Sequence, residues 1–185
     1  MSTTRELELL HMDLFGPTTY KSLGGNLYCL VIVDDYSRYT WVFFLHDKSE
    51  VASCFKKFAK RAQNEFEVKL KKIRSDNGKE FDNTNIEAYC DEVGIKQEVS
   101  ATYTPQQNGV VERKNRTLIT VARTMLDEYN TPEALWVEAI NTALCPKPLS
   151  LPLPPLSYTS LMRHRTVPRW LHAPLLVPCT TSIAS

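Results

Sequence analysis

Residues 26–45, NLYCLVIVDDYSRYTWVFFL, decide the fold, because they hold two apolar runs separated by a short polar link. The runs, residues 26–34 and 39–45, are rich in β-branched and aromatic side chains, which favour β-strands. A third apolar run precedes them at residues 9–15. Because short links join neighbouring antiparallel strands, the three runs predict an antiparallel meander.

Beyond residue 45 the sequence alternates between helical and strand periodicity. Ser49 is the expected N-cap of the first helix, and Gly94 is expected to end the second. Three antiparallel strands followed by strand–helix alternation predict an α/β domain with a mixed five-stranded sheet and helices on both faces. The predicted helices cover residues 49–66, 83–93, 109–129 and 132–144, and the predicted strands cover residues 68–74 and 95–99.

Composition limits the classes of protein that the chain can belong to. Its 185 residues are enough to bury a core. No apolar run is long enough to cross a membrane, and the amino end does not resemble a secretory signal. The five cysteines form no CxxC pair, and the four histidines lack metal-ligand spacing with them. We therefore expect an intracellular protein with no membrane partner and no small-molecule cofactor.

Composition changes near residue 145, which divides the chain into a predicted core, residues 1–144, and a tail, residues 145–185. Eight of the eleven prolines lie between Pro146 and Pro178, and no Asp, Glu or Gly follows Glu138. Proline fixes φ and removes a hydrogen-bond donor, so the tail is not expected to form helices or central strands. We interpret it as disordered or as the product of out-of-frame translation; a proline-rich ligand for an SH3-like partner is the alternative.

Three carboxylates stand at positions where an acid needs an explanation. Asp13 lies inside the apolar strand 9–15, where a carboxylate is costly unless it is hydrogen-bonded, paired or bound to a metal. Asp76 follows a predicted strand, and ligands bind at the carboxyl ends of strands in α/β sheets. Glu112 lies in the first turn of the long predicted helix. Each acid also has a structural explanation: a satisfied strand-end residue, an Asx turn and a favourable charge at a helix start.

Basic residues gather near Glu112, although the net charge of the chain is only +1. The apolar stripe of the helix leaves Glu112 at the edge of the buried face, and Arg116 and Arg123 follow it along the same side. Arg113 and Lys114 extend the basic group. A carboxylate at the edge of a core with cations beside it suits a metal site that borders a track of phosphates.

Five strings in order resemble the catalytic core of integrases from copia-type retrotransposons, which belong to the retroviral integrase family. The resemblance covers residues 5–143. The strings are LLHMDLFGP (9–17), LVIVDDYSRYTWVFFL (30–45), IRSDNGKEF (73–81), TYTPQQNGVVERKNRTL (102–118) and LWVEAINTA (135–143).

The resemblance implies an RNase H-like fold and a polynucleotidyl transferase that processes DNA 3′ ends and transfers strands. By motif position, Asp13, Asp76 and Glu112 form the catalytic triad. They would hold two Mg²⁺ or Mn²⁺ ions, which prefer hard oxygen ligands. The implied partners are the DNA ends of the element, target DNA and a second copy of the chain. The residues expected to contact nucleic acid are Gln106, Gln107, Asn108, Arg113, Lys114, Arg116 and Arg123.

The sequence also departs from the family pattern. The amino-terminal zinc module of integrases has no counterpart, and the tail replaces the usual continuation after Ala143. We expect these departures to limit activity to weak metal-dependent nicking or reversal of strand transfer. The alternative is an inactive remnant that binds nucleic acid weakly. An active protein is expected in the nucleus, although the sequence carries no clear localisation signal. Asp34, Asp35 and Arg38 are interpreted as structural residues that form a strand-end salt bridge.

Overall fold

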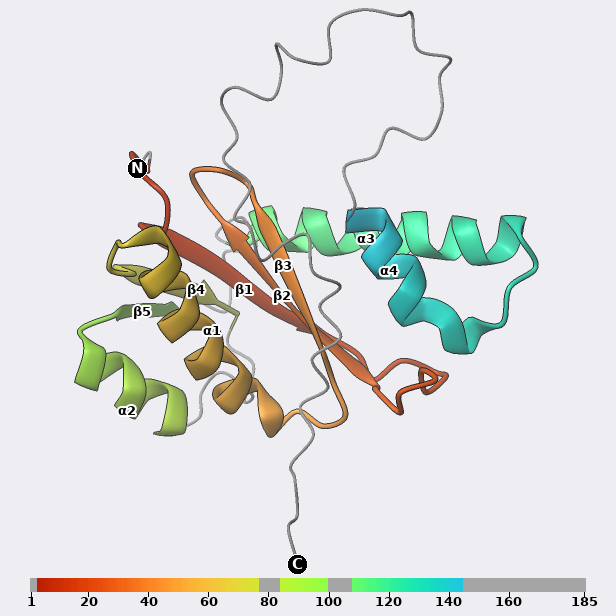
Figure 1. Ribbon diagram of the computed structural model, residues 1–185, viewed down its shortest axis with the longest axis horizontal. Coiled ribbons are helices and arrows are strands. Elements are labelled where there is room, and N and C mark those ends of the chain that lie inside the picture. The colour runs from red at the N-terminus through yellow and green to blue at the C-terminus, as the bar shows by residue number, and fades with distance from the viewer. Residues whose placement is uncertain (1–2, 77–83, 100–107, 145–185) are drawn as a thin grey trace, which may run out of the picture. The chain divides into compact units, whose positions relative to one another are not determined.

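The computed structural model describes residues 3–76, 84–99 and 108–144, which Figure 1 draws as coloured ribbon. The predicted tail, residues 145–185, lies outside the described residues. So do Gln106 and Gln107, and Asn77 and Gly78, which follow Asp76 in the chain.

A five-stranded sheet forms the centre of the domain, in the order β3-β2-β1-β4-β5. β1 pairs with β2, and β2 with β3, in antiparallel register, whereas β4 runs parallel to both β1 and β5. The predicted meander and the mixed five-stranded sheet are therefore confirmed. The strands are β1 (Leu9–Phe15), β2 (Tyr28–Asp34), β3 (Thr40–Leu45), β4 (Lys72–Ser75) and β5 (Lys96–Val99).

Helices cover both faces of this sheet, as predicted (Figure 1). Successive side chains of a strand point to opposite faces of the sheet. Two neighbouring residues of β3 show which helix covers each face. Phe43 packs against Phe58 of α1, with ring centroids 5.6 Å apart, while Phe44 packs against Trp136 of α4 at 5.5 Å. The helices are α1 (Glu50–Phe66), α2 (Thr84–Val93), α3 (Gly109–Glu128), the short 3₁₀ helix η2 (Glu133–Leu135) and α4 (Trp136–Leu144).

The α3 face holds the core that positions the candidate site. Alternate residues of β2 point to this face and are buried against α3 and α4. Val111, Leu118 and Ala122 supply the buried stripe of α3, which crosses β1 and β2. None of the helices in the described ranges is both long enough and apolar enough to cross a membrane.

The β2–β3 link is held by Asp34, whose side chain is 1% exposed. Its carboxylate accepts hydrogen bonds from the Leu7 N–H at 3.0 Å and from the Ser37 N–H and hydroxyl, each at 2.7 Å. Arg38 has a φ of 60° and forms an ion pair with Asp35 at 3.3 Å. The predicted strand-end salt bridge is confirmed.

The predicted start of β4 is wrong, because the strand begins at Lys72 rather than at residue 68. Glu67 has a φ of 52°, which ends α1 in the left-handed region and turns the chain. The Leu70 N–H then donates to the Gln63 side chain at 3.0 Å, and the Lys71 N–H donates to the Leu7 carbonyl at 3.1 Å. The apolar residues before β4 are thus buried by tertiary contacts rather than by sheet pairing.

Helix ends agree with the predictions in part. Gly94 has a φ of 76° and follows α2, as expected for a residue that ends a helix. Ser49 occupies the N-cap position of α1, but its side chain makes no capping hydrogen bond. The Asp47 carboxylate instead accepts the Ser49 N–H at 2.9 Å, and the Glu50 carboxylate accepts the His46 N–H at 3.0 Å.

Candidate active site

Parallel pairing brings Asp13 and Asp76 to the same end of neighbouring strands. Met12 is the register partner of Ser75, and Asp13 and Asp76 are the next residues along β1 and beyond β4. Both therefore lie at the carboxyl ends of parallel strands, where α/β sheets bind ligands. In β1, Asp13 is also paired across the sheet with Val31, on the face that α3 covers.

Helix α3 brings Glu112 toward the same place. Asn115, which is 5% exposed, donates from Nδ2 to Asp13 Oδ2 at 2.5 Å. Glu112 lies three residues earlier, roughly one helical turn, and its side chain is exposed. At the helix start, Asn108 is 2% exposed and donates from Nδ2 to the Met12 carbonyl at 3.3 Å. These two asparagines fix the first two turns of α3 on β1, directly over Asp13.

The charges of Asp76 and Glu112 act on Asp13. Burial raises the pKa of Asp13 to about 6, and the negative charge of Asp76 adds to this effect. Hydrogen bonds from Asn115 and the Leu14 backbone favour the charged form and partly oppose the rise, whereas Glu112 contributes a further increase in the pKa. Asp13 therefore lies where the fields of the other two carboxylates meet.

Three partly gathered carboxylates match the donor chemistry of Mg²⁺ and Mn²⁺, which take oxygen ligands. A cation beside Asp13 would relieve the repulsion that raises its pKa. In the part of the chain that the structure describes, however, no three Asp, Glu, His or Cys side chains are close enough to hold a metal ion. Ions bound here would have to draw the side chains of Asp76 and Glu112 toward Asp13.

Sequence reasoning missed the role of Asn115. It lies on the buried stripe of α3, together with Val111 and Leu118. A polar residue at an apolar position of a helix needs a buried partner, and this signal was available from helical spacing alone. Its partner, Asp13, is 102 residues away in the chain and could not be deduced from that spacing.

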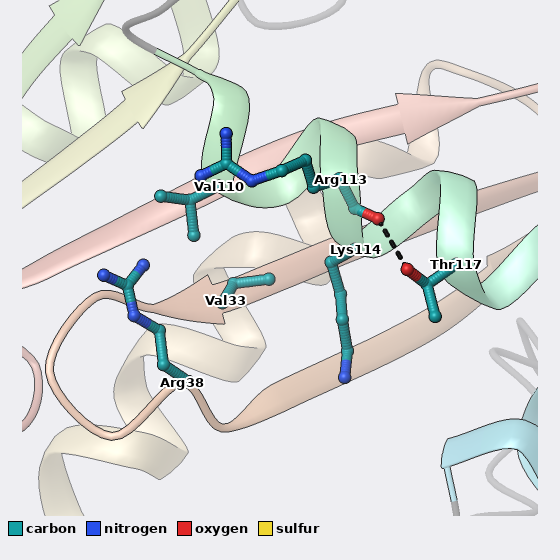
Figure 2. A pocket seen from close by; sticks show the side chains of 6 residues that line it. All are labelled: Val33, Arg38, Val110, Arg113, Lys114 and Thr117. Carbon is teal, nitrogen blue, oxygen red and sulfur yellow. Dashed lines mark hydrogen bonds between the residues drawn. The ribbon is translucent and has the colours of Figure 1, made fainter.

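The residues predicted to contact nucleic acid divide between the two flanks of α3. Arg116 and Arg123 are exposed and share the flank of Glu112, as helical spacing requires. Arg113 and Lys114 lie on the opposite flank, beside Val33 and Arg38, where Figure 2 shows them around a shallow hollow. Helix α3 therefore does not present one continuous track of basic side chains beside Glu112.

The buried side chain of Asn108 anchors the start of α3, so it faces β1 in this structure. Its predicted contact with nucleic acid stays a prediction. Gln106 and Gln107 lie outside the described residues, and their predicted contacts stay predictions as well.

Comparison with known proteins agrees with this architecture. The sequence model described as the integrase core domain matches residues 3–105, more than half of the chain. The matched region includes Asp13 and Asp76 and ends before Glu112. A cryo-EM structure of the simian T-cell lymphotropic virus intasome, in complex with the PP2A regulatory subunit B56 gamma, is similar in fold. Its TM-score is 0.59 at 21% identity, over 78% of this chain and 49% of that chain.

Two plant polyproteins are similar in sequence. The retrovirus-related Pol polyprotein from transposon TNT 1-94 of Nicotiana tabacum is 42% identical over 137 residues, which cover 74% of this chain and 10% of that protein. The corresponding polyprotein from transposon RE2 of Arabidopsis thaliana is 30% identical over 144 residues, 78% of this chain and 10% of that protein. The chain thus spans about a tenth of the length of these relatives.

The mixed sheet with helices on both faces, which is similar in fold to that intasome structure, defines an RNase H-like α/β fold. The chain belongs to the integrase core domain family, in the form found in the Pol polyproteins of plant retrotransposons.

Proposed function

We propose that this chain is a metal-dependent polynucleotidyl transferase core of copia type, which processes DNA 3′ ends and joins them to target DNA. One observation carries the proposal. The negative charges of Asp76 and Glu112 both act on Asp13, a largely buried acid at the carboxyl end of β1. A largely buried carboxylate that feels two further carboxylates, in a fold of this family, is expected where cations are held.

Asp13, Asp76 and Glu112 would hold two Mg²⁺ or Mn²⁺ ions. When bound, such ions activate an attacking oxygen and stabilise a leaving oxygen in phosphoryl transfer. The chain's own residues do the positioning. Asn115 holds one oxygen of Asp13, which limits rotation of that carboxylate, and Asn108 holds the start of α3 against β1.

DNA is the proposed substrate. Arg116 and Arg123 are exposed on the flank of α3 that carries Glu112, so they can meet the phosphates of a strand that approaches the acids. Contacts of this kind position a strand without reading its sequence. Because target DNA is chromosomal in this proposal, the nucleus is the proposed site of action.

A second candidate function is weak nucleic-acid binding without catalysis. It is favoured by one observation, since the described residues contain no group of three ligands close enough to hold a metal ion. Both candidates predict binding of DNA, but only the first predicts cleavage that depends on a divalent cation.

Cleavage of a branched DNA substrate separates the two candidates. The purified chain is incubated with Mn²⁺, with Mg²⁺, and with EDTA in place of the metal. The transferase proposal predicts cleavage and religation products with either metal and none with EDTA. A folded protein that binds the substrate and yields no product with either metal would contradict it and favour the non-catalytic candidate.

Asn115→Ala should lower the cleavage rate by about tenfold, which corresponds to the loss of one charge-assisted hydrogen bond. The bond to Asn115 favours the charged form of Asp13, so its loss should raise the pKa of Asp13 further. The rate profile should therefore shift to higher pH, an effect that general destabilisation would not produce. The measurement is the pH dependence of cleavage at a metal concentration below saturation, where protons compete with the metal for Asp13.

Thr120→Ala is the matched control for this variant, because Thr120 lies on the exposed side of the same helix. It should retain the rate and the pH profile of the unmodified chain. An unshifted pH profile for Asn115→Ala would mean that Asn115 supports the helix but does not act on Asp13.

A further inference from the structure

A shallow hollow of about 340 Å³ lies on the flank of α3 away from Glu112 (Figure 2). It is built from the end of β2, the β2–β3 link and the first three turns of α3. Its lining residues are Val33, Arg38, Val110, Arg113, Lys114 and Thr117. Three of these six side chains carry a positive charge, and none carries a negative charge.

The positive charge at the hollow is only partly neutralised. Arg38 pairs with Asp35 at 3.3 Å, but the same carboxylate accepts the Thr3 hydroxyl at 2.9 Å and lies 3.0 Å from His11 Nε2. The Arg38 side chain remains 58% exposed. Among the acids in the described ranges, none forms an ion pair with Arg113 or Lys114. An anion in the hollow would therefore meet a surplus of positive charge.

The start of α3 adds to this surplus. A side chain placed on Gly109 would come within 3.1 Å of Arg113 Nη1, so the guanidinium lies back over the first turn of the helix. Free N–H groups give a helix start a partial positive charge, which disfavours a cation there unless an anion lies close by. The conformation of Arg113 thus places a second positive group where the helix itself already attracts an anion.

The floor of the hollow distinguishes between kinds of anion. Val110 supplies partly exposed apolar surface between the three cations, whereas Val33 is 2% exposed (Figure 2). A free phosphate ion would gain nothing from this surface. A phosphodiester brings sugar carbons on either side of its charge, and these carbons can cover Val110.

We propose that this hollow binds a backbone phosphodiester of DNA, away from the bond that is cut at Asp13, Asp76 and Glu112. Arg38 and Lys114 neutralise the phosphate together with Arg113, and Val110 contacts an adjoining sugar. This inference rests on the proposed function, because it takes DNA as the ligand. It adds Arg38 and Thr117 to the DNA-binding surface and separates Arg113 and Lys114 from Arg116 and Arg123.

The test measures binding of a short DNA duplex by fluorescence anisotropy in EDTA, across a range of salt concentrations. Arg38→Gln combined with Lys114→Gln should weaken binding on the order of tenfold and reduce the slope of log K against log salt by about one. Arg38→Lys combined with Lys114→Arg keeps the charges and should bind nearly as the unmodified chain does. Lys60→Gln, on the exposed side of α1, should change neither affinity nor slope. Unchanged affinity and slope in the double glutamine variant would overturn the proposal.

A second pair of variants leaves every cation in place. Thr117→Glu puts a carboxylate into the hollow and should weaken duplex binding by at least as much as the double variant. Ser53→Glu puts the same charge on the exposed side of α1 and should have a much smaller effect. Equal losses in these two variants would overturn the proposal, because they would indicate a long-range effect of charge. Circular dichroism checks that each variant is folded.

A comparison with inorganic phosphate tests whether the hollow prefers a phosphodiester to a free anion. The expected result is that the duplex shifts the amide NMR signals of Val33, Val110 and Thr117, whereas phosphate alone at equal charge concentration does not. Equal shifts with phosphate would identify a site for free anions and overturn the phosphodiester proposal. These binding measurements contain no metal, so a negative result in them would not argue against metal-dependent cleavage. Conversely, a chain that does not cleave DNA can still be tested for binding at the hollow.

Discussion

Asp76→Asn should lower metal-dependent cleavage by about 100-fold or more and leave the fold and DNA binding intact. Asp76 lies beside Asp13 at the ends of two parallel strands, so its carboxylate is placed to share a cation with Asp13. The amide is nearly equal in size but is a weaker ligand for Mg²⁺, because it carries no charge. The measurement is the rate of cleavage of branched DNA in Mn²⁺, with duplex affinity measured in EDTA beside it.

Asp127→Asn is the control, because it makes the same chemical change at an exposed position near the end of α3. It should cleave as the unmodified chain does. Cleavage that survives in Asp76→Asn at the same rate would contradict the proposed site and indicate a contaminating nuclease.

Asp13→Asn should lower cleavage by about 100-fold or more, as Asp76→Asn should. It should nevertheless make the metal-free protein more stable at pH 8. The pKa of Asp13 is raised to about 6 in the folded chain, from an ordinary value of 3.8. Above pH 6, Asp13 is ionised in both states, and its negative charge costs more free energy in the folded state than in the unfolded state. Removing this charge should raise the free energy of unfolding by about 1–2 kcal/mol, after allowance for partial exposure of the side chain.

The sign of this effect depends on pH. As pH falls through about 6 toward 3.8, Asp13 becomes protonated in the folded state and its cost disappears. Urea unfolding in EDTA should therefore show a gain for Asp13→Asn at pH 8 that shrinks by pH 5. If the variant is less stable than the unmodified chain at pH 8, the charged Asp13 stabilises the metal-free fold, which would contradict this prediction.

Addition of Mg²⁺ should reverse the order of stability. A ligand that binds only the folded state stabilises it in proportion to the logarithm of its concentration above Kd. The unmodified chain should thus gain thermal stability with Mg²⁺, whereas Asp13→Asn should gain little.

Much of the fold could be predicted from the sequence, because its signals are local. β2 and β3 have β-branched and aromatic composition and are joined by a short link, so their pairing follows from chain order. The start of β4 could not be predicted in this way. The apolar residues before it resemble a strand, but Leu70 and Lys71 are held by Gln63 and Leu7, and such tertiary contacts leave no periodic signal.

The candidate site was predictable to a similar degree. β1 and β4 pair in parallel although β2, β3 and α1 lie between them in the chain. Parallel pairing brings the carboxyl ends of strands to the same edge of the sheet, and this explains why Asp13 and Asp76 are neighbours. Helical spacing alone separates Arg113 and Lys114 from Arg116, but the prediction treated them as one group. The hollow needed Arg38 from a hairpin far away in the chain, and no local pattern in the sequence connects that residue with α3.

Isothermal titration calorimetry of Mn²⁺ with the unmodified chain and with Glu112→Gln tests whether the three acids form one metal site. Glu112 is the decisive position because its side chain is exposed and it lies beyond the region matched by the family model. We expect Mn²⁺ to bind the unmodified chain and Glu112→Gln to lose most of this affinity while keeping its fold. Equal Mn²⁺ binding by both proteins would contradict a metal site shared by Asp13, Asp76 and Glu112.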